Sequence, residues 1–136
     1  MKCMLDTNIL VSAALFPNST AAAAYMKAAT MPFETVVCNY TMAELQRVFS
    51  EKFPERLQDH DRFIETMKTS IVIVDTPPEE EHNESESKIR DAKDRPILRS
   101  ALIAGVDVLV TGDKDFLEAG IESPLCLSAA DFLSRY

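Results

Sequence analysis

Four carboxylates stand apart along the sequence, each where a strand is expected to end or a helix to begin. Asp6 follows a short apolar run, Asp113 closes another, and Glu44 and Asp94 stand at the heads of expected helices. In an open parallel α/β sheet, the carboxyl ends of the strands meet along one edge, where ligands bind. Four carboxylates gathered there repel one another unless a hard cation such as Mg²⁺ or Mn²⁺ lies among them. The pattern therefore indicates metal-assisted attack on a phosphate.

Each of these acids also has a purely structural interpretation. Asp6 and Asp94 could cap the helices that follow them, because aspartate is favoured at helix N-caps. Thr41 and Glu44 have the spacing of a capping box, in which the glutamate bonds back to the threonine N–H. Asp113 could be a turn residue. The functional interpretation depends on a parallel sheet bringing these separate segments to one edge.

Strands and helices are expected to alternate along the whole chain. The expected strands are continuous apolar runs, which are typical of a parallel sheet covered by helices on both faces. They lie at residues 2–5, 35–38, 70–74, 107–111 and 125–127. Helices are expected at residues 8–16, 21–29, 41–52, 54–68, 97–104, 114–119 and 129–135. Residues 75–87 are polar and acidic, with two prolines, and form an expected loop of unassigned role.

Length and composition are those of one globular domain spanning residues 1–136. The N-terminal residues lack the architecture of a signal peptide, so a cytoplasmic location is expected. The net charge of −8 argues against a protein that simply coats nucleic acid, since such proteins are usually basic. It is compatible with an acidic nuclease and with a basic protein partner.

The remaining reactive side chains suggest no covalent catalysis. Cys3, Cys38 and Cys126 lie in or beside apolar runs without metal-ligand spacing, and we expect buried free thiols. The sequence contains no G-x-S-x-G motif, and neither His60 nor His82 lies near a cysteine motif. Both histidines are expected to be solvated residues of a helix and a loop.

Four segments share their residue types and order with a known family. They are Leu5-Asp6-Thr7-Asn8-Ile9-Leu10, Ala43-Glu44-Leu45, Asp91-x-x-Asp94-x-x-Ile97-Leu98 and Val110-Thr111-Gly112-Asp113-Lys114-Asp115-Phe116. Together they resemble the PIN domain, and in particular the VapC-like toxins of bacterial toxin–antitoxin systems. The resemblance implies a three-layer α/β/α fold whose parallel five-stranded sheet has the order 3-2-1-4-5. It also implies a Mg²⁺- or Mn²⁺-dependent endoribonuclease, a small antitoxin partner and a homodimer.

The resemblance assigns roles to individual acids. It matches Asp6, Glu44, Asp94 and Asp113 to the family's catalytic acids, with Asp6, Asp94 and Asp113 as metal ligands. Asp115 is an auxiliary acid that competes with Asp113 to face the metal. In the same way, Asp91 competes with Asp94 for the third position, and Asp94 is preferred because an apolar helix starts just after it.

Other polar residues flank the four acids. Thr111 and Asn8 are expected beside the site as auxiliary residues. Lys93, Arg95 and Lys114, together with Arg99, are candidates for contacts with substrate phosphates, which position a nucleic acid without reading its sequence. Their structural alternative is a solvated or ion-paired surface.

Two other functions remain open from the sequence. One is a catalytically silent PIN-like module that binds RNA or a protein. The other is a receiver-like phosphoacceptor domain, in which Asp75 would end the third strand and Thr111 the fourth. Against the receiver, a single acid follows the first strand, and no lysine follows the fifth.

Overall fold

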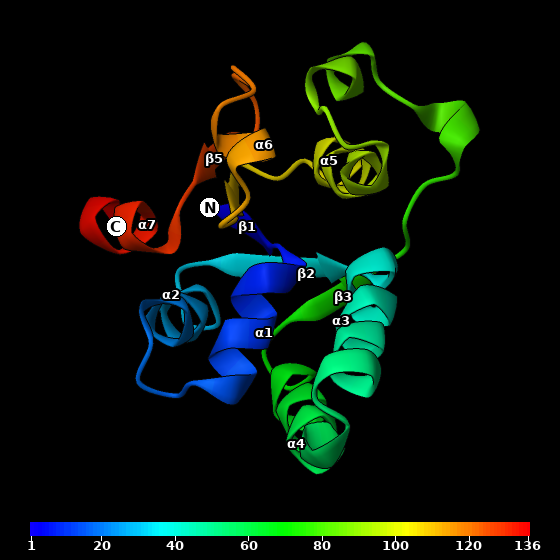
Figure 1. The fold of residues 1–136 in the computed structure, drawn as a ribbon. Coiled ribbons are helices and arrows are strands. Elements are labelled where there is room, and N and C mark those ends of the chain that lie inside the picture. Colours follow the sequence, from blue (N-terminus) through cyan, green and yellow to red (C-terminus); the bar gives the residue numbers. More distant parts are fainter.

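Five short parallel strands form the centre of the protein in a computed structural model that describes residues 1–136. The strands are β1 (Lys2–Leu5), β2 (Glu34–Cys38), β3 (Val72–Val74), β4 (Val108–Val110) and β5 (Leu125–Leu127). Their order across the sheet is β3-β2-β1-β4-β5, and every neighbouring pair is parallel (Figure 1). The predicted sheet and its strand order are confirmed.

Helices cover both faces of this sheet. They are α1 (Thr7–Leu15), α2 (Thr20–Ala28), α3 (Asn39–Lys52), α4 (Leu57–Met67), α5 (Arg95–Ile103), α6 (Lys114–Leu117) and α7 (Ala129–Arg135). Side chains alternate along each strand, so Cys3 and Leu5 join one core and Met4 joins the other. The larger core packs against α1, α2, α3, α4 and α7, and the smaller against α5 and α6. The predicted three-layer arrangement is therefore present.

Helix starts differ in places from the expected ones. The hydroxyls of Ser19 and Ser128 accept hydrogen bonds from the first turns of α2 and α7 and cap these helices. The start predicted at Thr41 is wrong, because α3 begins at Asn39 after Cys38. Thr41 is buried inside the helix, and its hydroxyl lies 3.3 Å from the Cys38 sulfur. The capping box that would occupy Glu44 does not form.

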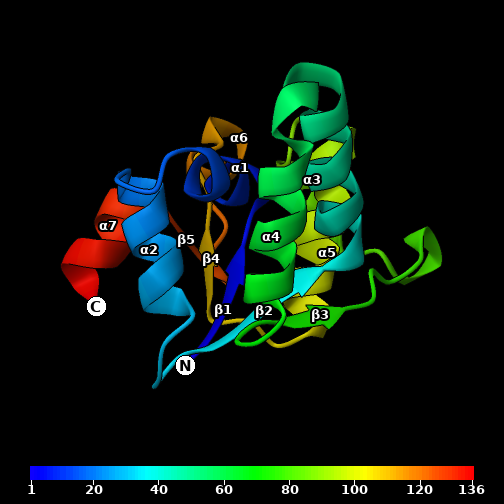
Figure 2. The same ribbon diagram turned by 90° about the horizontal axis from the view of Figure 1, so that it is seen from below.

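The segment after β3 leaves the body of the protein and returns to α5 (Figures 1 and 2). It contains two short 3₁₀ turns, η2 (Glu79–Glu81) and η3 (Glu84–Lys88), where the sequence predicted a loop. A third turn, η4 (Ala92–Asp94), leads into α5. Ile89 lies in the smaller core and anchors the returning chain.

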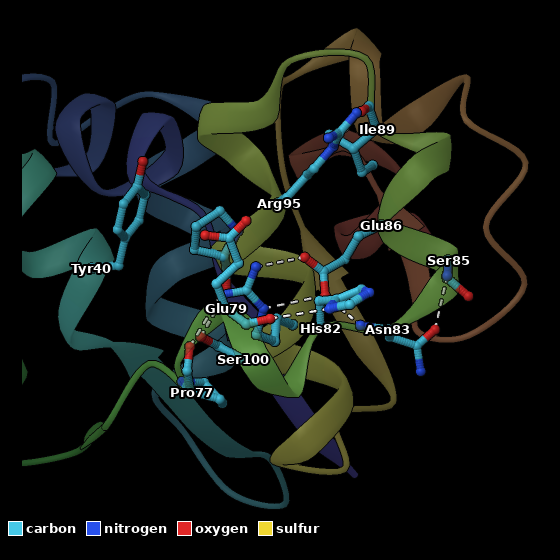
Figure 3. A network of polar contacts seen from close by, with 12 residues as sticks. Tyr40, Pro77, Glu79, His82, Asn83, Ser85, Glu86, Ile89, Arg95 and Ser100 are labelled. Carbon is cyan, nitrogen blue, oxygen red and sulfur yellow. Dashed lines mark hydrogen bonds and ion pairs between the residues drawn. The ribbon is translucent and has the colours of Figure 1, made fainter.

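A buried ion pair ties this segment to α5. Arg99 donates from Nη2 to Glu86 Oε1 at 2.7 Å and from Nε to Oε2 at 3.2 Å (Figure 3). Its Nη1 also donates to the Pro77 carbonyl at 3.1 Å. Glu86 accepts from the Asn83 N–H, completing a capping box on η3. Arg99 is therefore a structural residue, as its ion-paired alternative predicted, and its buried guanidinium does not support the candidate role in phosphate contact.

The predictions for the exposure of the histidines and cysteines are partly confirmed. The prediction that His60 is solvated is wrong: it is 8% exposed, and its ring centroid lies 5.3 Å from that of Phe49. His82 is exposed, as predicted. The three cysteines are free thiols, with Cys3 and Cys38 buried and Cys126 half-buried.

No single helix has the length and apolar composition to cross a membrane, although α1 and α2, bent by 110°, meet those two criteria as a pair.

Candidate active site

Asp6 lies at the junction of β1 and α1, at the carboxyl edge of the sheet. Its Oδ1 accepts a hydrogen bond from the Thr7 N–H at 2.7 Å, so it does cap α1. Its Oδ2 accepts from the Thr111 hydroxyl at 2.7 Å, which links the end of β1 to the end of β4. The side chain is 4% exposed. Asp6 therefore caps α1 and also belongs to the acidic site.

Glu44 faces the same edge from within α3. The Thr7 hydroxyl donates to Glu44 Oε1, and Arg47 Nη2 lies 3.8 Å from Oε2. This hydrogen bond joins Glu44 on α3 to Thr7 on α1. The interpretation of Glu44 as part of a capping box is therefore wrong. Because α3 starts at Asn39, Glu44 lies more than one turn inside the helix rather than at its head.

The η4 turn presents Asp94, and hydrogen bonds with Asp91 and Tyr40 hold this turn in place. Asp91 Oδ1 accepts from the Lys93 N–H at 3.0 Å, so Asp91 caps the turn. The Tyr40 hydroxyl donates to the Lys93 carbonyl at 2.5 Å, while the tyrosine ring packs on the smaller core. Asp94 makes no capping bond and faces the acidic edge. Asp94, the residue preferred from the sequence for the third acid, lines the acidic pocket, whereas Asp91 does not.

Asp113 and Asp115 follow β4 and start α6. Asp113 Oδ1 accepts from the Asp115 N–H at 2.9 Å, and the Asp113 N–H donates to the Thr111 hydroxyl at 3.0 Å. Asn8 Oδ1 accepts from the Gly112 N–H at 3.1 Å, which ties α1 to this turn. Thr111 and Asn8 therefore lie beside the acids, as predicted, and brace the turn that carries them.

The charges in this cluster are poorly compensated. Burial raises the pKa of Asp6 to about 6, against the lowering effect of its hydrogen bonds from Thr111 and Thr7. Partial burial, a hydrogen bond with Asp113 and the nearby carboxylates raise the pKa of Asp94 to about 7. Two arginines pair with acids of the cluster: Arg90 Nη2 is 3.2 Å from Asp115 Oδ1, and Arg47 Nη2 is 3.8 Å from Glu44 Oε2. No ion pair reaches Asp6, Asp94 or Asp113. The cluster thus carries negative charge that the protein itself does not neutralise.

The oxygens of this cluster have the chemistry of a hard-cation site. One carboxylate oxygen from each of Asp94, Asp113 and Asp115 lies within 4.8 Å of the other two. Oxygen ligands in this number suit Mg²⁺ or Mn²⁺, which keep several waters. The predicted ligands Asp94 and Asp113 belong to this group. It includes Asp115 and leaves out Asp6, whose oxygens accept from Thr7 and Thr111.

All four predicted catalytic acids line one pocket of about 340 Å³ between α1, α3 and the ends of β1 and β4. Its lining residues are Asp6, Thr7, Asn8, Val11, Ser12, Glu44, Val48, Lys52, Asp94 and Asp113. The predicted phosphate-binding side chains are not among them. Arg95 donates to the Ile89 carbonyl at 3.1 Å (Figure 3) and lines a separate polar hollow beside η3. Lys93 and Lys114 are exposed. Asp75 also lies outside the pocket and accepts from Asn39.

Several residues of the site were missed from the sequence. Thr7 connects Asp6 to Glu44, and its position between two predicted site residues was the available signal. Lys52 lies eight residues after Glu44, so the helical period places it on the same face. Tyr40 gave no signal, because its partner is a backbone carbonyl more than fifty residues away.

The fold and this acidic edge define a class of nuclease-like α/β domains. The family model described as "PIN domain" matches residues 2–115, and the chain belongs to this family. A comparison with curated proteins found no match.

Solved structures share this fold. One is VapBC2 from Rickettsia felis, solved with a DNA fragment from the VapBC2 promoter. It matches with a TM-score of 0.70 and 19% identity, covering 94% of this chain and 98% of that one. FitAcB from Neisseria gonorrhoeae matches with a TM-score of 0.66 and 18% identity, over the same shares of the two chains. Mycobacterium tuberculosis VapC20, a sarcin–ricin loop cleaving toxin, matches with a TM-score of 0.60 and 13% identity, covering 88% and 95%. At these identities the likeness establishes the fold.

Proposed function

We propose that the protein is a metal-dependent endoribonuclease that hydrolyses RNA phosphodiester bonds and acts as the toxin of a toxin–antitoxin pair. One observation carries the proposal: the carboxylates of Asp94, Asp113 and Asp115 converge within 4.8 Å, in the company of Asp6 and Glu44. Membership of the PIN domain family supports it, because its members are typically nucleases. The likeness to a sarcin–ricin loop cleaving toxin supports RNA as the substrate.

The residues of the pocket would have different roles in such a site. Asp94, Asp113 and Asp115 would hold Mg²⁺ or Mn²⁺, with Asp6 beside them. When bound, such an ion polarises a phosphodiester oxygen and lowers the pKa of a water molecule. Glu44, held by the Thr7 hydroxyl, faces the same pocket and orients the attacking water.

The hydrogen bonds around Asp6 keep the site in shape before substrate arrives. The Thr7 N–H and the Thr111 hydroxyl each take one oxygen of the Asp6 carboxylate and fix its plane. Thr111 also accepts from the Asp113 N–H, so the same hydroxyl positions two acids. Carboxylates oriented by such hydrogen bonds are already in position to hold a cation.

We propose that a small antitoxin is the protein partner of this PIN domain. We also propose that the protein is cytoplasmic and forms a homodimer. The similarity to VapBC2 and FitAcB supports the antitoxin. An arginine or lysine of the antitoxin would enter the acidic pocket, because charge-assisted bonds to carboxylates are strong. A co-purified partner that leaves both metal binding and nuclease activity unchanged would contradict this part of the proposal.

The test of the ribonuclease is cleavage of single-stranded RNA by the purified protein. We expect cleavage that requires Mn²⁺ or Mg²⁺, stops on chelation with EDTA, and is lost in Asp94→Asn. Asp131→Asn is the matched control, because Asp131 lies on α7 outside the acidic pocket. Equal cleavage by the native chain and Asp94→Asn would point to a contaminating nuclease and would refute the proposal.

A further inference from the structure

The acidic pocket continues beyond the carboxylates along the crevice between α1 and α3. On α3, Glu44, Val48 and Lys52 line it at successive turns. On α1, Asn8, Val11 and Ser12 form the facing wall. The pocket therefore changes character along its length, from carboxylates at one end, through two valines, to an ammonium group at the other. We call its far part, lined by Val11, Ser12, Val48 and Lys52, the α1–α3 groove.

Lys52 is the single cationic side chain that lines this pocket. The two arginines nearest the acids are already engaged, with Arg47 3.8 Å from Glu44 and Arg90 3.2 Å from Asp115. No carboxylate lies within ion-pairing distance of Lys52, which is exposed at the last residue of α3. Its charge is consequently free to meet a ligand.

We infer that the α1–α3 groove binds single-stranded RNA on one side of the scissile bond, with Lys52 contacting a backbone phosphate of a flanking nucleotide. The inference rests on the proposed ribonuclease and names how that site takes its substrate. Eight helical residues separate Glu44 from Lys52, a rise of about 12 Å. Successive nucleotides of one duplex strand advance by roughly 3.4 Å along the helix axis, and even an extended single strand advances by less than about 12 Å per nucleotide. Lys52 therefore meets a different phosphate from the one cleaved.

The charge distribution favours a polyanion over a protein segment in the groove. The carboxylates of the pocket repel the phosphates of a nucleic acid unless cations contact the adjoining backbone. Lys52 is the cationic side chain of the pocket that is placed to do so. The half-buried Val11 and Val48 offer an apolar surface to a base or ribose without hydrogen-bonding groups that would select one base. We therefore expect Lys52 to strengthen binding to RNA of any sequence.

The experiment compares steady-state cleavage of a labelled, mixed-sequence single-stranded RNA by Lys52→Met and by Lys68→Met in the presence of Mn²⁺. Methionine keeps an unbranched apolar side chain and removes the charge. Lys68 is the matched control, since it is exposed at the C-cap of α4 and does not line the pocket. Lys52→Met should raise KM roughly two- to fivefold, as for one exposed ionic contact, with kcat little changed.

Two further readouts separate a phosphate contact from a structural effect. The slope of log affinity against log salt, measured by RNA binding to Asp94→Asn, should become shallower by about 0.7 when Lys52→Met is added. Lys52→Arg, which keeps the charge, should retain a KM close to that of the native chain. Circular dichroism of each variant checks that α3 is intact.

The outcomes distinguish the groove from the ribonuclease itself. If the native chain cleaves RNA and Lys52→Met behaves like Lys68→Met, the groove proposal fails and the ribonuclease stands. If the native chain neither binds nor cleaves RNA, both fail. If Lys52→Met leaves RNA kinetics unchanged but weakens binding of a co-purified protein, the groove is a protein site and the inference is overturned.

Discussion

Single residues of the acidic cluster differ in how far their charge is compensated. Asp6 has two hydrogen-bond donors, and Asp115 has Arg90. Asp94 has neither kind of partner. Its partial burial, and after that its hydrogen bond with Asp113 and the neighbouring carboxylates, raise its pKa to about 7. Repulsion at Asp94 is therefore the part of the site that a bound cation would relieve most.

Replacing Asp94 by asparagine should stabilise the metal-free protein and abolish its response to metal. At pH 8 with EDTA, we expect Asp94→Asn to raise Tm by about 4 °C, the shift that about 1 kcal/mol produces in a domain of this size. Added Mn²⁺ should then raise the Tm of the native chain and leave the variant unchanged. Thermal unfolding followed by circular dichroism measures both effects, with Asp131→Asn as the control. A variant that is simply less stable would show that Asp94 has a structural role.

Removing the Tyr40 hydroxyl should loosen the turn that carries Asp94. Tyr40→Phe keeps the ring on the smaller core and deletes the bond to the Lys93 carbonyl. One hydrogen bond is worth about 0.5–1.5 kcal/mol, so we expect Mn²⁺ to bind roughly two- to tenfold more weakly, by calorimetric titration. Tyr25→Phe is the control, because Tyr25 lies in the larger core, away from η4. An unchanged affinity for Mn²⁺ would rule out a positioning role for Tyr40.

At the scale of elements, the segment between β3 and α5 is a structured strap rather than a free loop. Its one buried charged contact is the Glu86–Arg99 pair, with both side chains less than a tenth exposed. Burial opposes ionisation of Glu86, but the hydrogen bonds from Arg99 and the Asn83 N–H outweigh it and hold its pKa below the ordinary value of 4.5. The strap is therefore held at α5, the helix that starts directly after Asp94.

Neutralising Glu86 should destabilise the fold in a pH-dependent way. Glu86→Gln leaves a buried guanidinium without its counter-charge, and we expect a loss of about 3 kcal/mol in urea unfolding at pH 7. Because the folded-state pKa is lowered, the contribution of the pair is complete above about pH 4.5 and disappears as the pH falls through the folded-state value. Exposed Glu84 supplies the control, Glu84→Gln. A loss that stays constant down to pH 3 would show that charge is not its source.

For the whole molecule, metal should add stability to a fold that does not depend on it. Cores of 18 and 10 buried residues pack on opposite faces of the sheet, away from the acidic edge. We expect the native chain to stay folded in EDTA, with unchanged far-UV circular dichroism, and to gain about 2.7 kcal/mol at a Mn²⁺ concentration 100 times Kd. Unfolding on chelation would instead indicate a structural metal.

Much of the architecture followed from local pattern. Continuous apolar strands alternating with helices predict a parallel sheet covered on both faces, and the strand order came from the resemblance. The same pattern brought Asp6, Asp94 and Asp113 to one edge, because each directly follows a strand or precedes a helix. These inferences hold because strand direction and helix period depend on neighbouring residues.

Tertiary packing decided which atoms meet. Glu44 had a local partner in Thr41, yet the rotation of α3 against α1 directs it to Thr7. Arg99 had the charge for a phosphate contact, yet the returning strap buries it against Glu86. The sequence by itself determined the fold class and the convergence of the acids, since both arise from short-range periodicity. The tertiary structure decided that Asp115 joins the carboxylate cluster with Asp94 and Asp113, and that Lys52 lines the pocket. Side-chain partners from different elements depend on how the helices rotate and pack.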